Sequence, residues 1–434
     1  MKKIFVSVGL AAAGAAVMSS ARAQSMEAEA SPKLWNVSAS LRGFYDDNYS
    51  VTPAQKGSFG VEFSPSVSAN VAFGQTDIGI RYTFGMYYYL QRDQDGINPF
   101  DLTHTGDLWV DHAFNERWKL NLTDSAAVGQ DPQLVQGGAV VRVNGNNLGN
   151  RFSAKLNTDW TRDFSTSLHY GNNIYVYSDN SVTNNPSNPS EAALLNRIEQ
   201  NAGLDLQWHF TPDTIGFVGY NYSWVRYDGN GQIAAPFILI NPPSPPRTIY
   251  YNSSARDFDA HYGYVGLTEQ LTPNLSCSLR GGASLVDSFN DPVSPNTSVA
   301  PYADVSVTYT YRPGSYLQGG YTQNINPTDV STPNAVAHHL TQYQETSTFY
   351  MDINHQFNSK LSGSLLGQYS YSSYKDGGYS GNGDDDFSAS VSLNYQVNRH
   401  LSAEAGYNFD DLLSAINNRG YTRNRVYLGL SANY

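Results

Sequence analysis

The chain has 434 residues and a formal net charge of −12, with 15% charged and 13% aromatic side chains. Such an acidic chain is a poor partner for nucleic acid, because it has too few cations to neutralise a row of phosphates. Its single cysteine, Cys277, excludes an intrachain disulfide and a paired-cysteine metal or redox motif.

The N-terminus has the layout of a secretory signal peptide. Lys2 and Lys3 precede an apolar run over residues 4–18, and the triplet at residues 21–23, "ARA", follows as a small-residue cleavage site. The run is shorter than the roughly 20 residues that a membrane-spanning helix needs. We therefore predict export with cleavage after Ala23, a short periplasmic segment at residues 24–33, and one domain at residues 34–434.

Long, two-faced strands follow. In "TDIGIRYTFGMYYYL", residues 76–90, apolar side chains such as Ile78 and Ile80 alternate with polar or small ones such as Asp77 and Gly79. A period of two over this length indicates a β-strand longer than the five or six residues usual in globular proteins. After residue 23 no run approaches 18 consecutive apolar residues, which excludes membrane-spanning helices.

About 18 such segments recur, from residues 34–48 to residues 422–434, and their connections alternate between tight and long. This alternation is typical of an up-and-down transmembrane β-barrel with tight periplasmic turns and long extracellular loops. A sheet that spans a membrane must close on itself, because the bilayer offers its backbone no water. We predict an all-β antiparallel barrel of about 18 strands, with 16 as the alternative, in the bacterial outer membrane.

Charged side chains fall on the face opposite the apolar one, which predicts a wet lumen. These residues are Arg42, Glu62, Asp77, Arg81, Asp107, Asp111, Lys119, Lys155, Asp159, Asp205, Arg280, Asp304, Asp352, Glu404 and Arg425. They either guide a solute or pair with one another across strands, and the excess of acidic members favours a mild cation preference. In residues 256–271, Val265 and Leu267 oppose Tyr262 and Tyr264, which predicts a β-bulge.

The last segment, "VYLGLSANY", is expected to close the barrel against "LWNVSASL" near the start of the domain. It resembles the C-terminal assembly signal of bacterial outer-membrane proteins, with Tyr427, Gly429, Ala432 and Tyr434 in the matching positions. Ala432 departs from the bulky apolar residue usual there. The resemblance implies insertion by the barrel-assembly machinery.

The segments "SASLRGFYDDNYSVTP" and "GSFGVEFSPSVSANVAFG" resemble the N-terminal pattern of the family called putative beta-barrel porin type 2. The resemblance extends over the whole exported chain. It implies a pore-like outer-membrane barrel without fixed catalytic residues and names no solute. Related barrels in exopolysaccharide export clusters imply a polysaccharide conduit as an alternative.

The longest connection, residues 229–255, contains the apolar run "IAAPFILI". A run of this kind is unusual in water, so we expect it to fold inward as a constriction, to contact a neighbouring subunit, or to pack as a hairpin on the barrel rim. The candidate constriction residues are Ile233, Phe237, Ile238, Leu239 and Ile240.

No catalytic, cofactor or metal site is predicted. The sequence has no G-x-S-x-G elbow beside its histidines. The acidic clusters at residues 93–95 and 384–386 match no EF-hand spacing and are interpreted as solvated rim charges. The adjacent His338 and His339 have no carboxylate nearby in the sequence and are weak metal ligands.

We therefore expect a porin for passive diffusion of small hydrophilic solutes. The alternatives are an exopolysaccharide export barrel and a plugged barrel that only displays surface loops. The expected partners are outer-membrane lipid, lipopolysaccharide, the barrel-assembly machinery and small solutes, and the oligomeric state is left open.

Overall fold

The computed structural model describes residues 34–129, 135–136, 139–140, 147–178, 189–228, 231–239, 243, 245–293 and 295–434. The predicted signal peptide, the segment at residues 24–33 and Ile240 lie outside the described residues. Among those that are described, no helix is long and apolar enough to cross a membrane.

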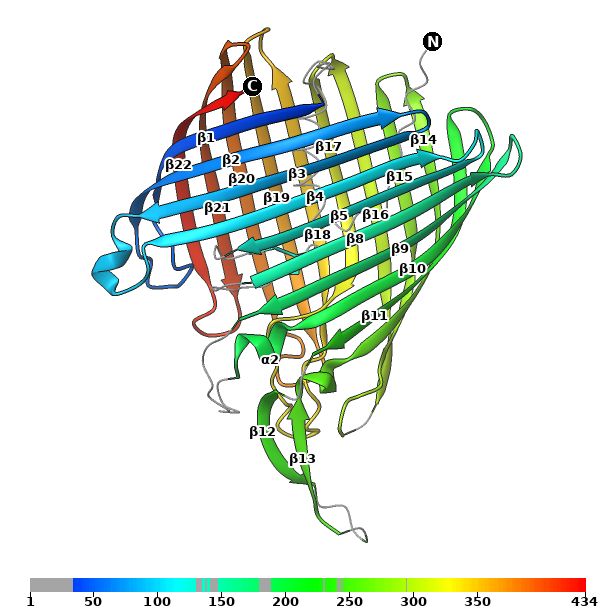
Figure 1. Cartoon of the computed structure of the whole chain (residues 1–434). Coiled ribbons are helices and arrows are strands. Elements are labelled where there is room, and N and C mark those ends of the chain that lie inside the picture. Colours follow the sequence, from blue (N-terminus) through cyan, green and yellow to red (C-terminus); the bar gives the residue numbers. More distant parts are fainter. Residues whose placement is uncertain are drawn as a thin grey trace.

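Eighteen antiparallel strands form one closed barrel (Figure 1). The strands are β1 (Trp35–Asp46), β2 (Ser58–Phe73), β3 (Thr76–Tyr89), β4 (Phe100–Ala113), β5 (Trp118–Gly129), β8 (Asn147–Asp159), β9 (Phe164–Tyr177), β10 (Arg197–His209), β11 (Thr214–Tyr227), β14 (Phe258–Thr272), β15 (Leu275–Ser288), β16 (Asn296–Arg312), β17 (Ser315–Asn326), β18 (Tyr343–Gln356), β19 (Leu361–Lys375), β20 (Gly383–Asn398), β21 (Leu401–Ser414) and β22 (Tyr421–Asn433). β1 pairs with β2 on one side and with β22 on the other, which closes the sheet. The predicted fold and strand number are confirmed.

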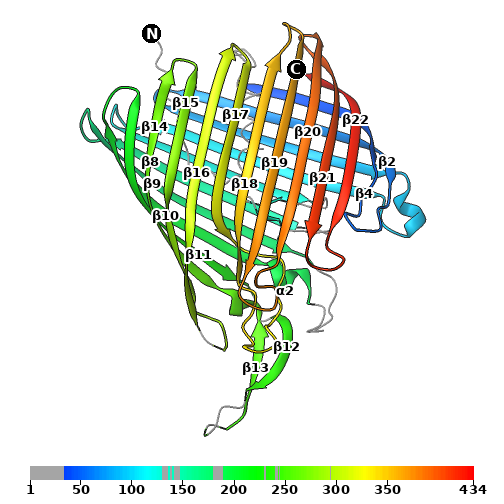
Figure 2. The same ribbon diagram turned by 180° about the vertical axis from the view of Figure 1, so that it is seen from behind.

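The two ends of the barrel differ. The start of β1 and the end of β22 lie at the end with the tight turns, where Ser38 is paired with Asn433. The long connections gather at the opposite end (Figures 1 and 2). They contain η1 (Arg92–Asp95), the two-residue strands β6 (Val135–Gln136) and β7 (Ala139–Val140), α2 (Glu191–Leu195), the hairpin of β12 (Gln232–Leu239) and β13 (Arg247–Asn252), and η2 (Ser253–Arg256). We call this end the mouth.

The outer face of the barrel is apolar. In β22, Val426, Leu428 and Leu430 are between 47% and 69% exposed, as expected for side chains that face lipid. At the tight-turn end the outer aromatic rings meet in pairs, with centroids of Trp118 and Trp160 5.5 Å apart and those of Phe164 and Trp208 equally close. Such rings form the aromatic girdle of a membrane barrel at a lipid–water boundary.

The bulge predicted within residues 256–271 does not lie between Tyr262 and Leu267, where the alternation suggested it. β14 pairs with β11 without a register shift, and the one shift towards β15 falls between Gln270 and Thr272, next to the tight turn. Val265 is 61% exposed, whereas Tyr262 and Tyr264 are buried inside the barrel. The alternation is therefore regular. The two tyrosines face the lumen and make the inner wall aromatic in this region.

Candidate functional site: the barrel lumen and its mouth

A partly buried charge cluster lies on the inner wall where the barrel closes. Arg42 donates from Nε to Oε1 of Glu404 at 2.7 Å and from Nη1 to Oε1 of Glu62 at 3.1 Å. Arg42 and Glu62 lie on the paired strands β1 and β2, whereas Glu404 of β21 comes near Arg42 only because the barrel closes through β22. The Arg42 side chain crosses Gly429, where a Cβ atom would lie 2.6 Å from Arg42 Cγ.

The other sequence-predicted lumen charges also lie beside inner-wall partners. The contacts are Arg81 with Asp107 (3.0 Å), Asp111 with Asn121 (2.5 Å), Lys119 with Asp159 (3.9 Å), Asp205 with the Tyr264 hydroxyl (2.6 Å), Asp352 with the Tyr316 hydroxyl (3.0 Å) and Arg425 with Asp46 (2.9 Å). By register, Asp77 lies opposite Asp111, Lys155 opposite His169, and Arg280 opposite Asp304. Because several opposite charges are paired across strands, the wall carries less uncompensated charge than its residue count suggests.

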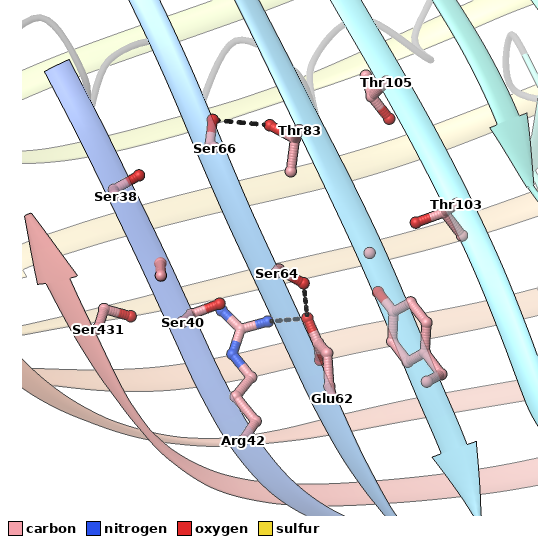
Figure 3. A pocket seen from close by; sticks show the side chains of 13 residues that line it. Ser38, Ser40, Arg42, Glu62, Ser64, Ser66, Thr83, Thr103, Thr105 and Ser431 are labelled. Carbon is pink, nitrogen blue, oxygen red and sulfur yellow. Dashed lines mark hydrogen bonds and ion pairs between the residues drawn. The ribbon is translucent and has the colours of Figure 1, made fainter.

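Hydroxyl groups surround a hollow in the inner wall. The hollow has a volume of about 440 Å³ and is lined by strands β22 and β1 to β4 (Figure 3). Its serines and threonines are Ser38, Ser40, Ser64, Ser66, Thr83, Thr103, Thr105 and Ser431, and Arg42 and Glu62 lie at one side. We call this part of the lumen the hydroxyl wall.

Large inner side chains lie flat against the wall, each over a glycine on the neighbouring strand. A Cβ atom on Gly79 would lie 1.8 Å from the ring of Trp109, its cross-strand partner. Gly406 and Tyr427 form a second such pair, with a distance of 2.3 Å. Because the glycines leave space for the rings, these aromatic residues take up little of the lumen.

The opposite part of the lumen contains a cluster of buried apolar and aromatic side chains. Buried residues of β11 and β14 to β16 form one cluster there, and it includes Tyr262, Val286 and Tyr302. The pairing of β16 with β17 begins at Ala303, although β16 itself starts at Asn296. The mouth-side tips of β17 and β18 are therefore free to lean inward and cover the cluster.

Tyr343, at the tip of β18, shows this covering directly. Its ring lies 5.9 Å from that of Phe258 between centroids, and its hydroxyl bonds to that of Ser298. Phe258 and Ser298 both belong to the lumen-facing rows of their strands. We call this part of the lumen the aromatic wall.

One loop at the mouth contacts several of the other connections between strands. Residues 327–342, between β17 and β18, contact four other connections of the barrel. Arg419 binds Asp329 through both terminal nitrogens at 2.7 and 2.8 Å, and its Nε donates to Asp384 at 2.7 Å. Burial would lower the pKa of Arg419, but Asp329, Tyr374 and Asp384 outweigh it and hold the pKa well above its usual value. The guanidinium therefore stays charged and ties this loop to the β21–β22 connection.

Three further contacts fix the same loop from the other side. Arg256 donates to the carbonyl oxygen of Thr328 at 2.9 Å, and Nδ1 of His339 lies 3.2 Å from Asp291. The ring of His338 stacks on Phe237 with centroids 4.0 Å apart. We call residues 327–342 the hub loop.

The predicted constriction at residues 233–240 is not formed by its described residues. β12 and β13 pair with each other and project past the strand ends, away from the lumen (Figure 2). Ile233 and Ile249 are buried against Tyr251 and against Leu340 of the hub loop, with Phe237 and Leu239 packed alongside, while Ile238 is 64% exposed. Residues 233–239 of the apolar run are thus covered outside the barrel, in a hairpin that packs on the rim.

Of the two acidic clusters, Asp93 and Asp95 are exposed at the rim as expected, whereas the cluster at residues 384–386 differs because Asp384 and Asp386 are buried. Asp95 is paired with Lys56 at 2.9 Å and accepts from the Tyr49 hydroxyl at 2.5 Å, and burial together with this bond raises the pKa of Tyr49 to about 12. Asp384 is fully buried beside Arg419. In the described residues, no group of three or more His, Cys, Asp or Glu side chains could hold a metal ion.

Several inner charges were not predicted from the sequence. Asp46 binds Arg423 at 2.6 Å, and it continues the row of Ser40 and Arg42 along β1. Extending the alternation by two positions would have found it. Arg419, Asp329 and Arg256 gave no such signal, because they lie in connections without periodicity.

The profile of the family described as "Putative beta-barrel porin 2" matches residues 34–434. The chain belongs to this family, and with its closed barrel it is a porin-like barrel of the outer membrane. A comparison with curated proteins gives no match.

Solved structures that are similar include OccAB4 from Acinetobacter baumannii, with 10% identity, a TM-score of 0.42, and coverage of 93% of this chain and 99% of that one. Another is opdK from Pseudomonas aeruginosa, with 10% identity, a TM-score of 0.43, and coverage of 92% and 99%. The siderophore receptor PiuA from Acinetobacter baumannii has 11% identity, a TM-score of 0.45, and coverage of 93% and 82%.

Proposed function

We propose that this chain is a pore through which small hydrophilic solutes diffuse across the outer membrane. The hydroxyl wall is the observation that supports it: polar side chains surround a hollow of about 440 Å³ inside the barrel. A lumen lined by hydroxyls and paired charges offers a passing solute hydrogen bonds in place of its water. Elsewhere on the wall, the rings of Trp109 and Tyr427 lie flat over Gly79 and Gly406 and so extend little into the lumen.

A mild cation preference is part of the proposal. Arg42 contacts two carboxylates at once, so the cluster of Arg42, Glu62 and Glu404 has a formal charge of −1 when all three are ionised. A negative ring or cluster in a narrow lumen attracts cations and repels anions. The cluster borders the hydroxyl wall, where it acts on passing ions.

A closed barrel that displays its loops is the second candidate, and the hub loop favours it. This loop is fixed to other connections through Asp329, Thr328 and His339. Polysaccharide export gains less support, since export needs exposed aromatic platforms. Tyr89 is fully buried and has the guanidinium of Arg92 3.6 Å from its ring centroid.

The test is the conductance of the refolded protein in a planar bilayer under a salt gradient. Two proteins are compared: the full chain and a variant with residues 331–341 replaced by two glycines. Val336→Ser, in the same loop at a side chain that is 88% exposed, is the control that leaves the hub contacts in place.

We expect stable, cation-preferring channels from the full chain and at least roughly twofold higher conductance from the loop variant. Silence from the full chain with conductance from the variant would indicate a closed pore that must be opened. Silence from both folded proteins would refute the pore and favour the display barrel.

A further inference from the structure

An acidic side chain lies on the outer face of the barrel, far from either end of its strand. In β5, Ser125 points into the lumen and donates to Asp107 at 2.8 Å. Its neighbour Asp124 therefore points outward, in the row of Leu122 and Val128. With a rise of about 3.4 Å per residue and a tilt of about 40°, Asp124 lies roughly 15 Å above Trp118 of the girdle. The apolar band of such barrels is about 25 Å tall, so Asp124 lies near its middle.

Asp124 belongs to a row of polar outer side chains. Nδ2 of Asn150 donates to Asp124 Oδ1 at 2.8 Å. The register then leads from Asp124 to Phe152, from Phe152 to Asn172 and from Asn172 to Gln200. We call Asp124, Asn150, Asn172 and Gln200, on β5, β8, β9 and β10, the polar belt.

Apolar side chains lie on both sides of the polar belt. Towards the mouth they are Val128, Leu148, Val176 and Ile198, which are 39% to 43% exposed. Towards the tight turns they include Leu168 and Leu204, which are 52% and 42% exposed. The polar belt is thus part of the surface that faces the membrane interior and does not mark its edge.

Polar groups at this depth need partners, because lipid tails offer no hydrogen bonds. Oδ1 of Asn172 accepts no hydrogen bond from any described residue and is covered by its own barrel, so a partner satisfies it only when this side chain turns outward. Next to the belt the surface is flat: Gly106 and Ala126 are cross-strand neighbours, and a Cβ atom on Gly106 would meet nothing within 4 Å. Small residues beside polar ones are typical of protein–protein contacts inside membranes.

We propose that the polar belt and the flat ground around Gly106 form the interface with a second copy of this chain. The belt is self-complementary, since its amides both donate and accept and its carboxylate accepts. Lipid acyl chains could satisfy none of these groups. The phosphates of lipopolysaccharide lie at the membrane boundary rather than at mid-depth, and the carboxylate of Asp124 repels them. This inference is independent of whether the lumen conducts.

Disulfide cross-linking in native outer membranes tests the contact. Cysteine replaces Asn150, Asn172 or Gln200 in the full chain carrying Cys277→Ser, because Cys277 is the only native cysteine. The variants are oxidised singly and after pairwise coexpression, so that twofold and ring arrangements are both detected. The matched control is Gly367→Cys, an outward position of β19 with equally open surroundings.

We expect adducts of twice the chain mass from at least one belt position or pair and none from the control. An adduct of another mass, or equal yields at belt and control positions, would overturn the proposal.

A second measurement does not depend on cross-linking chemistry. Gly106→Trp places a large ring in the proposed interface, where the surrounding barrel has room for it. Sedimentation of the protein extracted in mild detergent is expected to shift to the monomer mass, whereas Gly367→Trp keeps the mass of the wild type. A wild-type protein that is already monomeric, or a Gly106→Trp variant that stays oligomeric, would refute the interface.

Discussion

The barrel wall and the mouth are held together by different interactions. In the wall, strands that follow one another along the chain pair with each other, and β22 pairs with β1 to close the sheet. Stability comes from this repeated backbone ladder, as in the 13 residue pairs that join β10 to β11. In the mouth, single side chains join distant connections, as when Arg419 binds Asp329 90 positions earlier. The mouth can therefore loosen when a single side-chain contact is lost, while the backbone ladder keeps the wall closed.

The largest effect is expected at Arg419. Changing it to Met leaves Asp329 and Asp384 buried without their cation, which costs about 3–5 kcal/mol for a buried pair. Hydrogen exchange should show lost protection in the hub loop and unchanged protection in the strands.

Lys119→Met is the control for Arg419→Met. Its pair with Asp159 spans 3.9 Å and is close to half exposed, so it contributes at most about 1 kcal/mol. Unchanged protection of the hub loop in the Arg419 variant, or loss throughout the wall, would break the distinction between mouth and wall.

The next effect concerns the wall itself. Gly79→Ala puts a methyl group where the ring of Trp109 now lies, 1.8 Å from the ideal Cβ position. The ring must turn into the lumen, at a cost of about 1–3 kcal/mol. The midpoint of heat unfolding in detergent and the single-channel conductance should both fall.

Gly149→Ala is the matched control, because the Cβ would meet the ring of Tyr175 at an ordinary 3.9 Å. If both alanines lower stability equally, the close packing of rings over glycines does not stabilise the wall.

A smaller effect is expected on ion selectivity. Arg42→Gln removes the cation between Glu62 and Glu404 and leaves two carboxylates beside the hydroxyl wall. One added unit of negative charge in wet surroundings should raise the permeability of cations over anions by about twofold. The reversal potential in a salt gradient measures it, with Lys360→Gln in a tight turn as the control. A shift towards anions would contradict the proposed role of this cluster.

The smallest effect is a pH dependence in the mouth. Burial raises the pKa of Asp257, although it accepts bonds from the Tyr227 backbone and from Asn290. A raised pKa means that the folded mouth holds this proton more tightly than the unfolded chain does. Stability therefore increases as the pH falls from neutral through the raised value, and the gain is complete below the ordinary pKa of about 3.9.

Hydrogen exchange over residues 253–258, corrected for the intrinsic pH effect, should show more protection at mildly acid pH than at neutral pH. Asp257→Asn should remove that difference. A difference that persists in the variant would assign the pH effect to another group.

Much of the wall could be predicted from alternation. A strand that separates lipid from water must show opposite chemistry on its two faces, so Arg81 between Ile80 and Tyr82 marks the lumen side without knowledge of its neighbours. The rule failed at Tyr262 and Tyr264, because an aromatic residue is compatible with either face. Asp124 also departs from this rule, because it is a polar residue on the lipid face.

The partners of these charges could be predicted only in part. Arg81 and Asp107 lie on consecutive strands, which the sequence order makes neighbours. Arg42 and Glu404 are 362 positions apart, and they meet because β22 closes the barrel between β1 and β21.

By itself, the sequence determined the class of fold, the strand number and the two faces of each strand, because a membrane imposes a period of two that is visible residue by residue. The tertiary structure alone decided how the mouth is arranged. Residues 233–239 lie at the rim, the hub loop packs around Arg419, and Asp124 is aligned with Asn172 and Gln200 on the outer wall. These contacts join residues far apart in the chain, and no local pattern records which of them will meet.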